Sequence, residues 1–145
     1  MNQIKVFNVE IDGIDKSGKD SIKPYIFYLE PGKFLTRSRG LISQIAYAKL
    51  YGREFDWDAL EYTKNTLFVL LTVDELDWSI RCKITNEPNT GFTFEQMQNA
   101  FMNAYVEVKD RFDVPDKQML IIDTTAHTPY VIASAIISRL NELNT

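Results

Sequence analysis

The stretch Gly13-Ile-Asp-Lys-Ser-Gly-Lys19 decides how the rest of this 145-residue chain is interpreted. It follows Val6–Ile11, a run typical of a buried strand. A glycine at the start and a Gly-Lys pair at the end are typical of a phosphate-binding loop (P-loop). In such a loop, backbone N–H groups surround a phosphate and the lysine adds a positive charge. The usual loop continues with Ser or Thr, whose hydroxyl helps to hold Mg²⁺, but here Asp20 has that place and Ser21 follows.

The strand before the loop and the alternating pattern after it favour phosphate binding over a plain strand-to-helix turn with a surface lysine. The candidate residues for nucleotide binding are Gly13, Asp15, Lys16, Ser17, Gly18, Lys19, Asp20 and Ser21. A carboxylate at position 20 is a good Mg²⁺ ligand, but it also repels a triphosphate. Three alternatives therefore stay open: Asp20 holds the metal, Ser21 holds it, or the loop binds nucleotide weakly.

The composition is ordinary for a soluble globular protein, with 45% hydrophobic and 25% charged residues. The length suits one domain, which we expect to span residues 1–145. A net charge of −4 argues against a nucleic-acid partner. The one cysteine, Cys82, excludes internal disulfides and fits a reducing compartment. No apolar run reaches about 18 residues and the N-terminus leaves no room for a signal peptide, so we expect a cytoplasmic protein without a membrane partner.

Short apolar runs alternate with helical stripes along the chain. Strands are expected at Val6–Ile11, Lys33–Thr36, Thr66–Val73 and Gln118–Asp123. Helices are expected over 21–29, with Pro24 in the first turn, and over 41–51, 57–64, 74–83, 93–111 and 129–143. This alternation predicts an α/β layer fold with a parallel sheet. Ligands of such sheets bind at the carboxyl ends of strands, where the P-loop and Asp123-Thr-Thr both fall.

Three local patterns predict where helices begin. Thr93 and Gln96 have the spacing of a capping box, Thr128-Pro129 gives an N-cap followed by a proline, and Asp56 can cap a helix. The aromatic residues Phe92, Phe94, Phe101, Tyr105 and Phe112 fall largely on one helical stripe and are expected in the core.

Arg37 and Arg39 end the second strand, and Ser43, Gln44 and Tyr47 begin the helix after it. One interpretation is a solvated pair of arginines before an amphipathic helix. The other is a clamp for an acceptor phosphate, since guanidinium groups bind phosphate through two N–H groups and stabilise transition-state charge.

The helix over 74–83 carries another arginine. Arg81 can pair with Asp77 at i, i+4 on a solvated face, or it can reach a transferred phosphate together with Lys83. The single histidine, His127, is expected to lie in the loop before the last helix, because no second histidine or nearby cysteine completes a metal site or nucleophile pair.

Two motifs resemble those of a known family. Asp12-Gly-Ile-Asp-Lys-Ser-Gly-Lys19 is similar to the P-loop of thymidylate kinases and related deoxynucleotide kinases, which read acidic-G-x-D-x-x-G-K. Arg39-Gly-Leu-Ile-Ser-Gln-Ile-Ala-Tyr47 resembles the family's D-R-x-x-x-S-[N/Q]-x-A-Y signature. The order of elements after Val73 resembles the family too. The resemblance implies a three-layer, P-loop nucleoside-monophosphate-kinase-like domain with a small, mostly parallel sheet.

The resemblance implies that the γ-phosphoryl group of ATP is transferred, with Mg²⁺, to a deoxynucleoside monophosphate such as dTMP. Lys19 and the loop amides would hold the donor phosphates. Arg39 would touch phosphate near the point of transfer, and Arg81 would belong to a phosphate-clamping segment.

The resemblance also implies contacts with both nucleotides. Gln44 would meet the edge of the acceptor base, and Tyr47 would crowd the sugar where a ribose 2′-OH would sit. Thr124 and Thr125 would lie near the donor base.

The chain departs from the family at several points. Ser38 stands where the family has Asp, and the segment after Arg81 is brief and poor in arginine. Only about 20 residues separate the P-loop from Arg39, where the family inserts helices that shape the acceptor pocket. The chain thus resembles a shortened member, of the kind expected in a phage genome and acting in the host cytoplasm. A reduced pocket could recruit walls from a second copy, which makes a homodimer one expectation. The alternative function is a catalytically impaired relative that binds a nucleotide or a protein partner.

Overall fold

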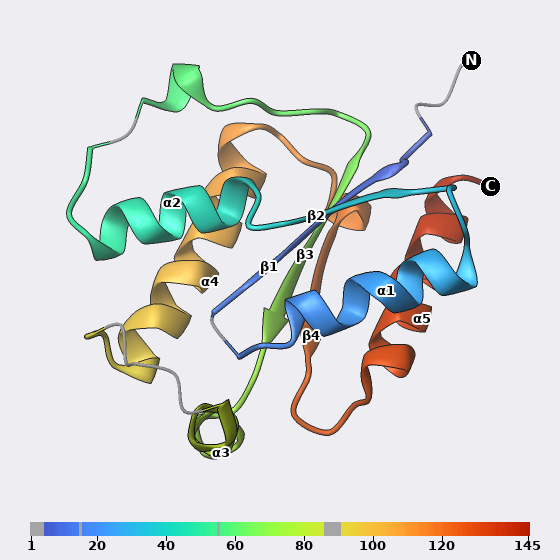
Figure 1. Cartoon of the computed structure of the whole chain (residues 1–145). Helices are drawn as coiled ribbons and strands as arrows, with labels where there is room; N and C mark the ends of the chain where they lie inside the picture. The colour runs from blue at the N-terminus through green and yellow to red at the C-terminus, as the bar shows by residue number, and fades with distance from the viewer. Residues whose placement is uncertain (1–4, 15, 55, 86–90) are drawn as a thin grey trace.

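The computed structural model describes residues 5–14, 16–54, 56–85 and 91–145. Within these ranges the chain forms a four-stranded sheet with helices on both faces (Figure 1). The strands are β1 (Asn8–Gly13), β2 (Leu35–Ser38), β3 (Thr66–Thr72) and β4 (Met119–Asp123), and their order is β2-β1-β3-β4. All three neighbouring pairs are parallel, which confirms the predicted α/β fold with a parallel sheet.

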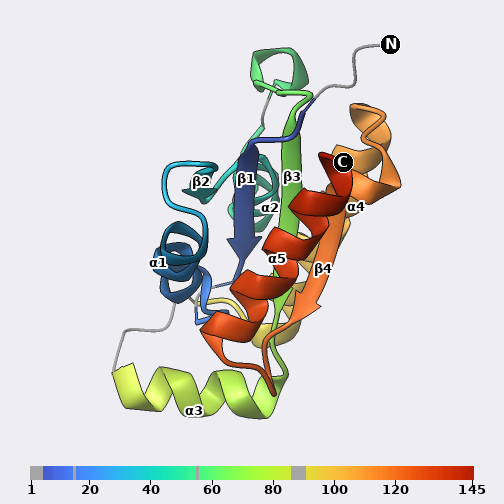
Figure 2. The same ribbon diagram turned by 90° about the vertical axis from the view of Figure 1, so that its right-hand side faces the viewer.

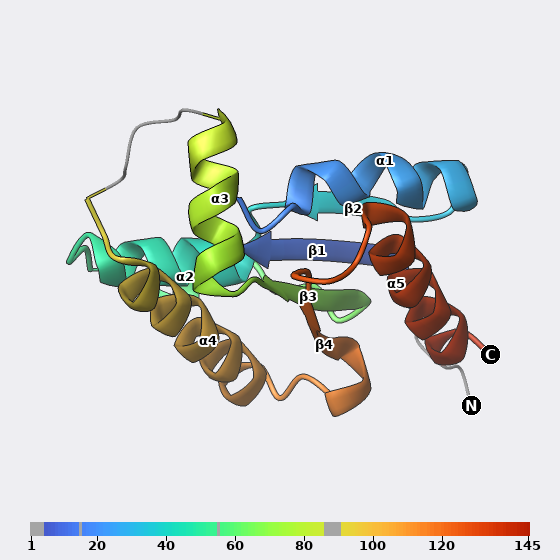
Figure 3. The ribbon, with the colours of Figure 1, turned by 90° about the horizontal axis from the view of Figure 1, so that it is seen from below.

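The sheet is the middle of three layers. Figure 3 shows α1 (Lys19–Leu29) and α5 (Pro129–Leu143) on one face, and α2 (Leu41–Leu50) and α4 (Phe94–Arg111) on the other. The helix α3 (Glu75–Thr85) belongs to neither face. It lies across the end of the sheet to which the strands point (Figure 2). This end is where parallel sheets bind ligands.

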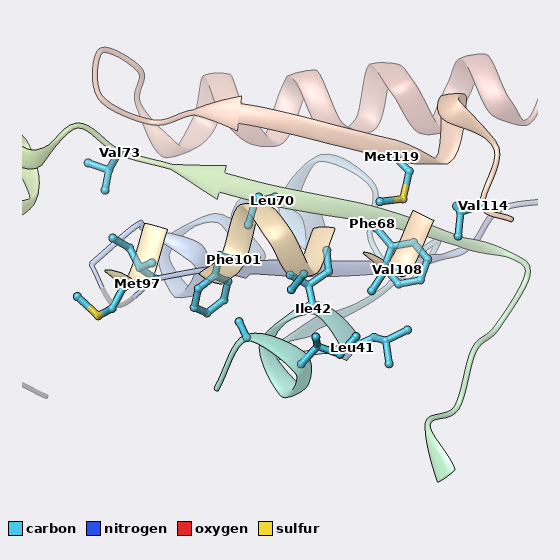
Figure 4. Close-up of a cluster of buried hydrophobic side chains, with 14 residues drawn as sticks. Leu41, Ile42, Phe68, Leu70, Val73, Met97, Phe101, Val108, Val114 and Met119 are labelled. Atoms are coloured by element: carbon cyan, nitrogen blue, oxygen red, sulfur yellow. The ribbon is translucent and has the colours of Figure 1, made fainter. Parts of the chain in front are cut away.

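Two apolar clusters hold the layers together. One fills the space between the sheet and the pair α2 and α4, with Phe68, Leu70 and Phe101 among its buried side chains (Figure 4). The other lies under α1 and α5. Because apolar clusters lie on both sides, β3 is buried from Thr66 to Leu71, as a central parallel strand should be. The predicted aromatic residues Phe92, Phe94, Phe101, Tyr105 and Phe112 all belong to or pack against the first cluster.

The predicted helix starts are confirmed. Thr93 caps α4 in a full capping box with Gln96, at 3.1 and 2.9 Å. The Thr128 hydroxyl accepts from the backbone N–H of Val131 at 3.3 Å, and proline occupies the first turn of α5.

The predicted helix Trp57–Lys64 is wrong. Asp56 does cap a helical turn, but that turn is the short 3₁₀ helix η1 (Trp57–Ala59), and Leu60 is already extended. Packing explains the difference. Tyr62 stacks on Phe68 and on Phe112, with ring centroids 6.1 and 4.9 Å apart, and an extended backbone lets its side chain reach the core.

The position of Pro24 also differs from the prediction. Helix α1 begins at Lys19 and not at Ser21, so Pro24 lies inside the helix instead of in its first turn. A proline there removes one helical hydrogen bond. The remaining elements lie where they are predicted, with ends that shift by one or two residues.

The two ends of the described chain meet at the side of the sheet opposite α3. The side chain of Asn144 donates to the carbonyl oxygen of Val6 at 2.8 Å and accepts from the Val6 N–H at 2.7 Å. Of the helices in the described ranges, none combines the length and the apolar character that a membrane span requires.

Candidate functional site

The segment between β1 and α1 is curled, not extended. Lys16 and Gly18 both have left-handed backbone, with φ of 69° and 99°, and the N–H of Ser17 donates to the carbonyl of Ile14 at 3.1 Å. Left-handed residues in a tight turn direct successive N–H groups inward, which makes a concave binding surface for an anion. The turn leads directly into the N-terminus of α1, whose partial positive charge adds to the same attraction.

Close packing explains why the loop opens with a glycine. A Cβ atom on Gly13 would lie 2.5 Å from the hydroxyl of Ser17 and 2.8 Å from the carbonyl oxygen of Leu71. Any side chain at position 13 would therefore push the loop away from β3.

Lys19 bends back over the loop. Its ammonium group is buried and donates to the carbonyl oxygens of Gly13 at 3.1 Å and Ile14 at 3.4 Å. The hydroxyl of Ser17 is also buried and has no hydrogen-bond partner among the described residues. A buried hydroxyl without a partner is costly, and an oxygen of a bound phosphate would relieve that cost. The donor set of the loop therefore fits an anion.

Arg81 connects α3 to the loop. Its guanidinium donates to the carbonyl of Lys16 at 2.7 Å and to Thr124 at 3.3 Å, through both the hydroxyl and the carbonyl of that residue. The same group pairs with Asp77 at 2.7 Å, so the predicted i, i+4 ion pair is confirmed. The pair does not keep Arg81 away from the loop, because one guanidinium serves both contacts.

A cavity of about 270 Å³ opens beside these groups. Loop and helix residues line one side, and the start of α5 lines the other. Its lining comprises Lys16, Ser17, Gly18, Ser21, Ile22, Arg81, Thr124, His127, Pro129 and Ile132. The cavity thus joins cationic and backbone donor groups to a small apolar floor. His127 lies in the loop before α5, as predicted, and is exposed.

The structure brings together most of the residues predicted for nucleotide binding, namely Gly13, Lys16, Ser17, Gly18, Lys19, Ser21, Arg81 and Thr124. Asp20 is exposed and does not line the cavity. Thr125 turns away: its hydroxyl accepts from the N–H of Asp74, and its own N–H donates to Asp123, both at 2.9 Å. That bond lowers the pKa of the Asp123 carboxyl. Asp15 lies outside the described residues.

The residues predicted for the acceptor lie on the neighbouring segment, around the start of α2. Arg37 and Arg39 are exposed, and Arg37 approaches the carboxylate of Glu10 at 4.0 Å. Gln44 is exposed, whereas Tyr47 is half-buried and packs edge-on against Phe101, with ring centroids 5.4 Å apart. These residues do not line the 270 Å³ cavity, so the two predicted halves of the site are separate surfaces.

Ser43, the last of this predicted group, is buried, and its hydroxyl donates to the carboxylate of Asp12. Asp12 and Glu10 are charged groups of the site that the sequence did not reveal as such. Burial raises the pKa of both carboxyls, that of Asp12 to about 6. The signal was present in the sequence: the two acidic residues alternate with Val9 and Ile11 in strand β1.

The layer order, the curled loop and the helix that it opens define a P-loop nucleoside-monophosphate-kinase-like fold. Among solved structures, the chain is similar to thymidylate kinase from Candida albicans, a protein described as having broad substrate specificity. The TM-score is 0.52, the identity is 14%, and the match covers 97% of this chain and 94% of that one. The chain therefore has a thymidylate-kinase-like fold. No protein-family model matches it, and neither does any curated protein.

Proposed function

We propose that this protein binds ATP at the P-loop and transfers the γ-phosphoryl group to a deoxynucleoside monophosphate resembling dTMP. One observation carries the proposal: the loop between β1 and α1 curls into an anion-binding shape, with Lys19 folded over it and Arg81 docked against it. Phosphoryl transfer depends mainly on positioning and charge neutralisation, so a site of amides and cations suits it without a nucleophilic side chain.

The geometry of the loop suggests which residues bind the donor nucleotide. The loop amides and Lys19 hold the β- and γ-phosphates. Arg81 stays within reach of the same group because it already contacts the loop at Lys16. The apolar floor of the cavity and Thr124 accommodate the rest of the donor.

Mg²⁺ needs few protein ligands at such a site, because it keeps waters and binds phosphate oxygens. Ser21 is the better candidate than Asp20, since Ser21 lines the cavity beside the loop and Asp20 does not. Bound there, Mg²⁺ would supply positive charge against the charge that develops on the donor phosphates.

On the acceptor side, Arg37 and Arg39 attract the monophosphate, while Gln44 and Tyr47 select base and sugar. We further propose that residues 1–145 act as one domain. The short connection between P-loop and Arg39 supports a shortened, phage-encoded member that works in the cytoplasm of the host and completes its acceptor pocket in a homodimer.

A coupled assay tests the proposal with ATP, Mg²⁺ and each common deoxy- and ribonucleoside monophosphate. We expect turnover with a deoxynucleotide, and a fall in kcat of about 100-fold or more in Lys19→Ala, because a transition-state donor is lost. Lys23→Ala is the matched control, since Lys23 lies on α1 but outside the loop and the cavity. Wild-type turnover no higher than that of Lys19→Ala would rule out the kinase.

A second candidate function is a binding module without transfer. Ser38 in place of the family's Asp and the exposed Asp20 favour it, because both changes affect the carboxylates and hydroxyls around the metal. Isothermal titration with ATP separates the candidates. Binding without product supports a nucleotide-binding module, and no binding at all supports a protein-interaction role.

A further inference from the structure

Two carboxylates of β1 contact the start of α2. Glu10 and Asp12 alternate along the strand and face α2, whereas Val9 and Ile11 belong to the apolar cluster on the opposite face. Asp12 is fully buried, and the side chain of Glu10 is only 12% exposed. Asp12 also directly precedes Gly13, the first residue of the P-loop.

Both carboxylates bind the start of α2. Asp12 accepts hydrogen bonds from the N–H of Gly40 at 2.7 Å, the N–H of Ser43 at 3.3 Å and the Ser43 hydroxyl. Glu10 accepts from the N–H of Leu41 at 2.8 Å. The N-cap residue of α2 is Gly40, which has no side chain to cap the helix. Glu10 and Asp12 therefore replace the missing cap, and their negative charge suits a helix N-terminus.

The turn that these carboxylates hold is strained. Arg39 has a left-handed backbone with φ of 61°, a conformation that L-residues other than glycine rarely adopt. Such a residue persists only where the surrounding structure fixes it. The next residue is fitted closely as well, because a Cβ on Gly40 would lie 2.6 Å from the carboxyl carbon of Glu10. Since Ser38 pairs with Ile11, Arg39 lies one strand away from the start of the P-loop.

We propose that Glu10 and Asp12 are positioning residues: they lock the turn 39–43 against β1 and so fix Arg39 relative to the P-loop. This inference rests on the proposed function for its catalytic consequence. One strand thereby carries both halves of the site, because β1 ends in the loop that receives the donor and its carboxylates hold the turn that receives the acceptor.

Energetics support a role beyond capping. The second carboxylate oxygen of Asp12 has no hydrogen-bond partner in the described part of the chain, and burial makes its ionised form costly. The charged side chains around it are Glu10 on the same strand, which makes ionisation costlier, and Arg37 on β2, which approaches Glu10 at 4.0 Å. An asparagine would avoid that cost, but its neutral amide oxygen accepts weaker hydrogen bonds than a carboxylate does. The carboxylate therefore strengthens the bonds to the turn at a cost to the stability of the fold.

Three variants test the lock: Glu10→Gln and Asp12→Asn remove charge, and Gly40→Ala displaces the Glu10 carboxylate without changing charge. Asp56→Asn is the matched control, because Asp56 also caps a helical turn but lies on η1, outside both candidate surfaces. The measurements are amide hydrogen exchange at Gly40, Leu41 and Ser43, calorimetric affinity for ATP and for dTMP, and kcat. The melting temperature of each variant verifies that it is folded.

We expect exchange at the three amides to accelerate about tenfold or more in all three variants, with affinity for dTMP or kcat falling about 10- to 100-fold. ATP affinity should stay within about twofold, since the P-loop is unchanged, and Asp56→Asn should resemble the wild type. A structural cap alone would lower the melting temperature without separating acceptor binding from donor binding.

Unchanged amide exchange in Asp12→Asn and Glu10→Gln would overturn the inference, whatever the activity. Faster exchange with unaltered dTMP affinity and kcat would overturn it too. If the wild type binds dTMP but transfers nothing, the proposed kinase fails, while weaker dTMP binding in the variants still supports the lock. If the wild type binds no monophosphate, the turn has no acceptor to position and the inference fails as well.

Discussion

Asp12 combines complete burial with a carboxyl whose pKa burial raises to about 6. In the unfolded chain the same carboxyl titrates near the ordinary aspartate pKa of 3.8. Between these two values the folded protein binds the extra proton, so the folded state gains stability as pH falls through about 6 and loses it as pH rises.

This difference predicts a pH effect on stability. From about pH 5.5 to about pH 7.5, the wild type should lose about 1 kcal/mol of unfolding free energy relative to Asp12→Asn, which cannot titrate there. Urea unfolding of both proteins at several pH values measures it. Parallel curves for wild type and variant would show that folding does not raise the pKa of Asp12.

Two substitutions of Arg39 separate the loss of its charge from the backbone strain at this position. Its left-handed φ of 61° suits glycine better than alanine, so Arg39→Gly should be more stable than Arg39→Ala by about 1 kcal/mol. Both variants lack the guanidinium and should lose phosphoryl transfer to the same degree. Chemical denaturation and the coupled assay, run on the pair, provide the two measurements. Equal stability of the two variants would mean that the turn relaxes when the arginine is removed.

At the scale of elements, Arg81 links α3 to the loop between β1 and α1. Arg81 contacts Lys16 and Thr124, and a second contact joins Trp78 to Phe94, with ring centroids 5.5 Å apart. Arg81→Ala should therefore accelerate amide exchange across α3 while leaving β3 protected, and should weaken ATP binding. Exchange measured by NMR or mass spectrometry shows whether α3 opens independently. Lys83→Ala is the control, because Lys83 is exposed on the same helix and does not line the cavity.

Sequence patterns located β3 and β4 well because each contains a compact apolar run, as in 66–72, that fits a parallel strand. They failed at Trp57–Lys64, where Asp56 gives a true cap signal but tertiary packing of Tyr62 favours extended chain. Pro24 was misplaced because the helix starts directly after Gly18, and a loop that ends in a helix leaves no separate start signal.

The candidate site likewise has features that the sequence predicts and features that it does not predict. The curled shape of the loop after β1 was predictable because it requires glycine at fixed places, as the contacts of Gly13 show. The docking of Arg81 on Lys16 was not, because it depends on how α3 crosses the sheet. Glu10 and Asp12 were missed for a related reason: their partners are backbone amides of α2, and a sequence does not display which amides lie opposite a strand.

At the scale of the whole molecule, the two halves of the chain pack into one unit. β1, β2 and β3 come from the first half, but β4 and the helices α4 and α5 come from the second half. Helix α1 packs beside α5 from the other end of the chain. Unfolding should thus be one cooperative transition, with circular dichroism and the fluorescence of Trp57 and Trp78 changing together. Two separated transitions would contradict a single domain over residues 1–145.

Asn144, which ends α5, is hydrogen-bonded to Val6, which precedes β1. The C-terminal end of α5 and the start of β1 lie at the end of the sheet remote from α3 (Figure 2). An affinity tag or a surface anchor attached next to either of these residues would consequently sit on the far side from the 270 Å³ cavity. Immobilised protein should keep that cavity open to solution, which makes surface-based binding measurements practical in either orientation.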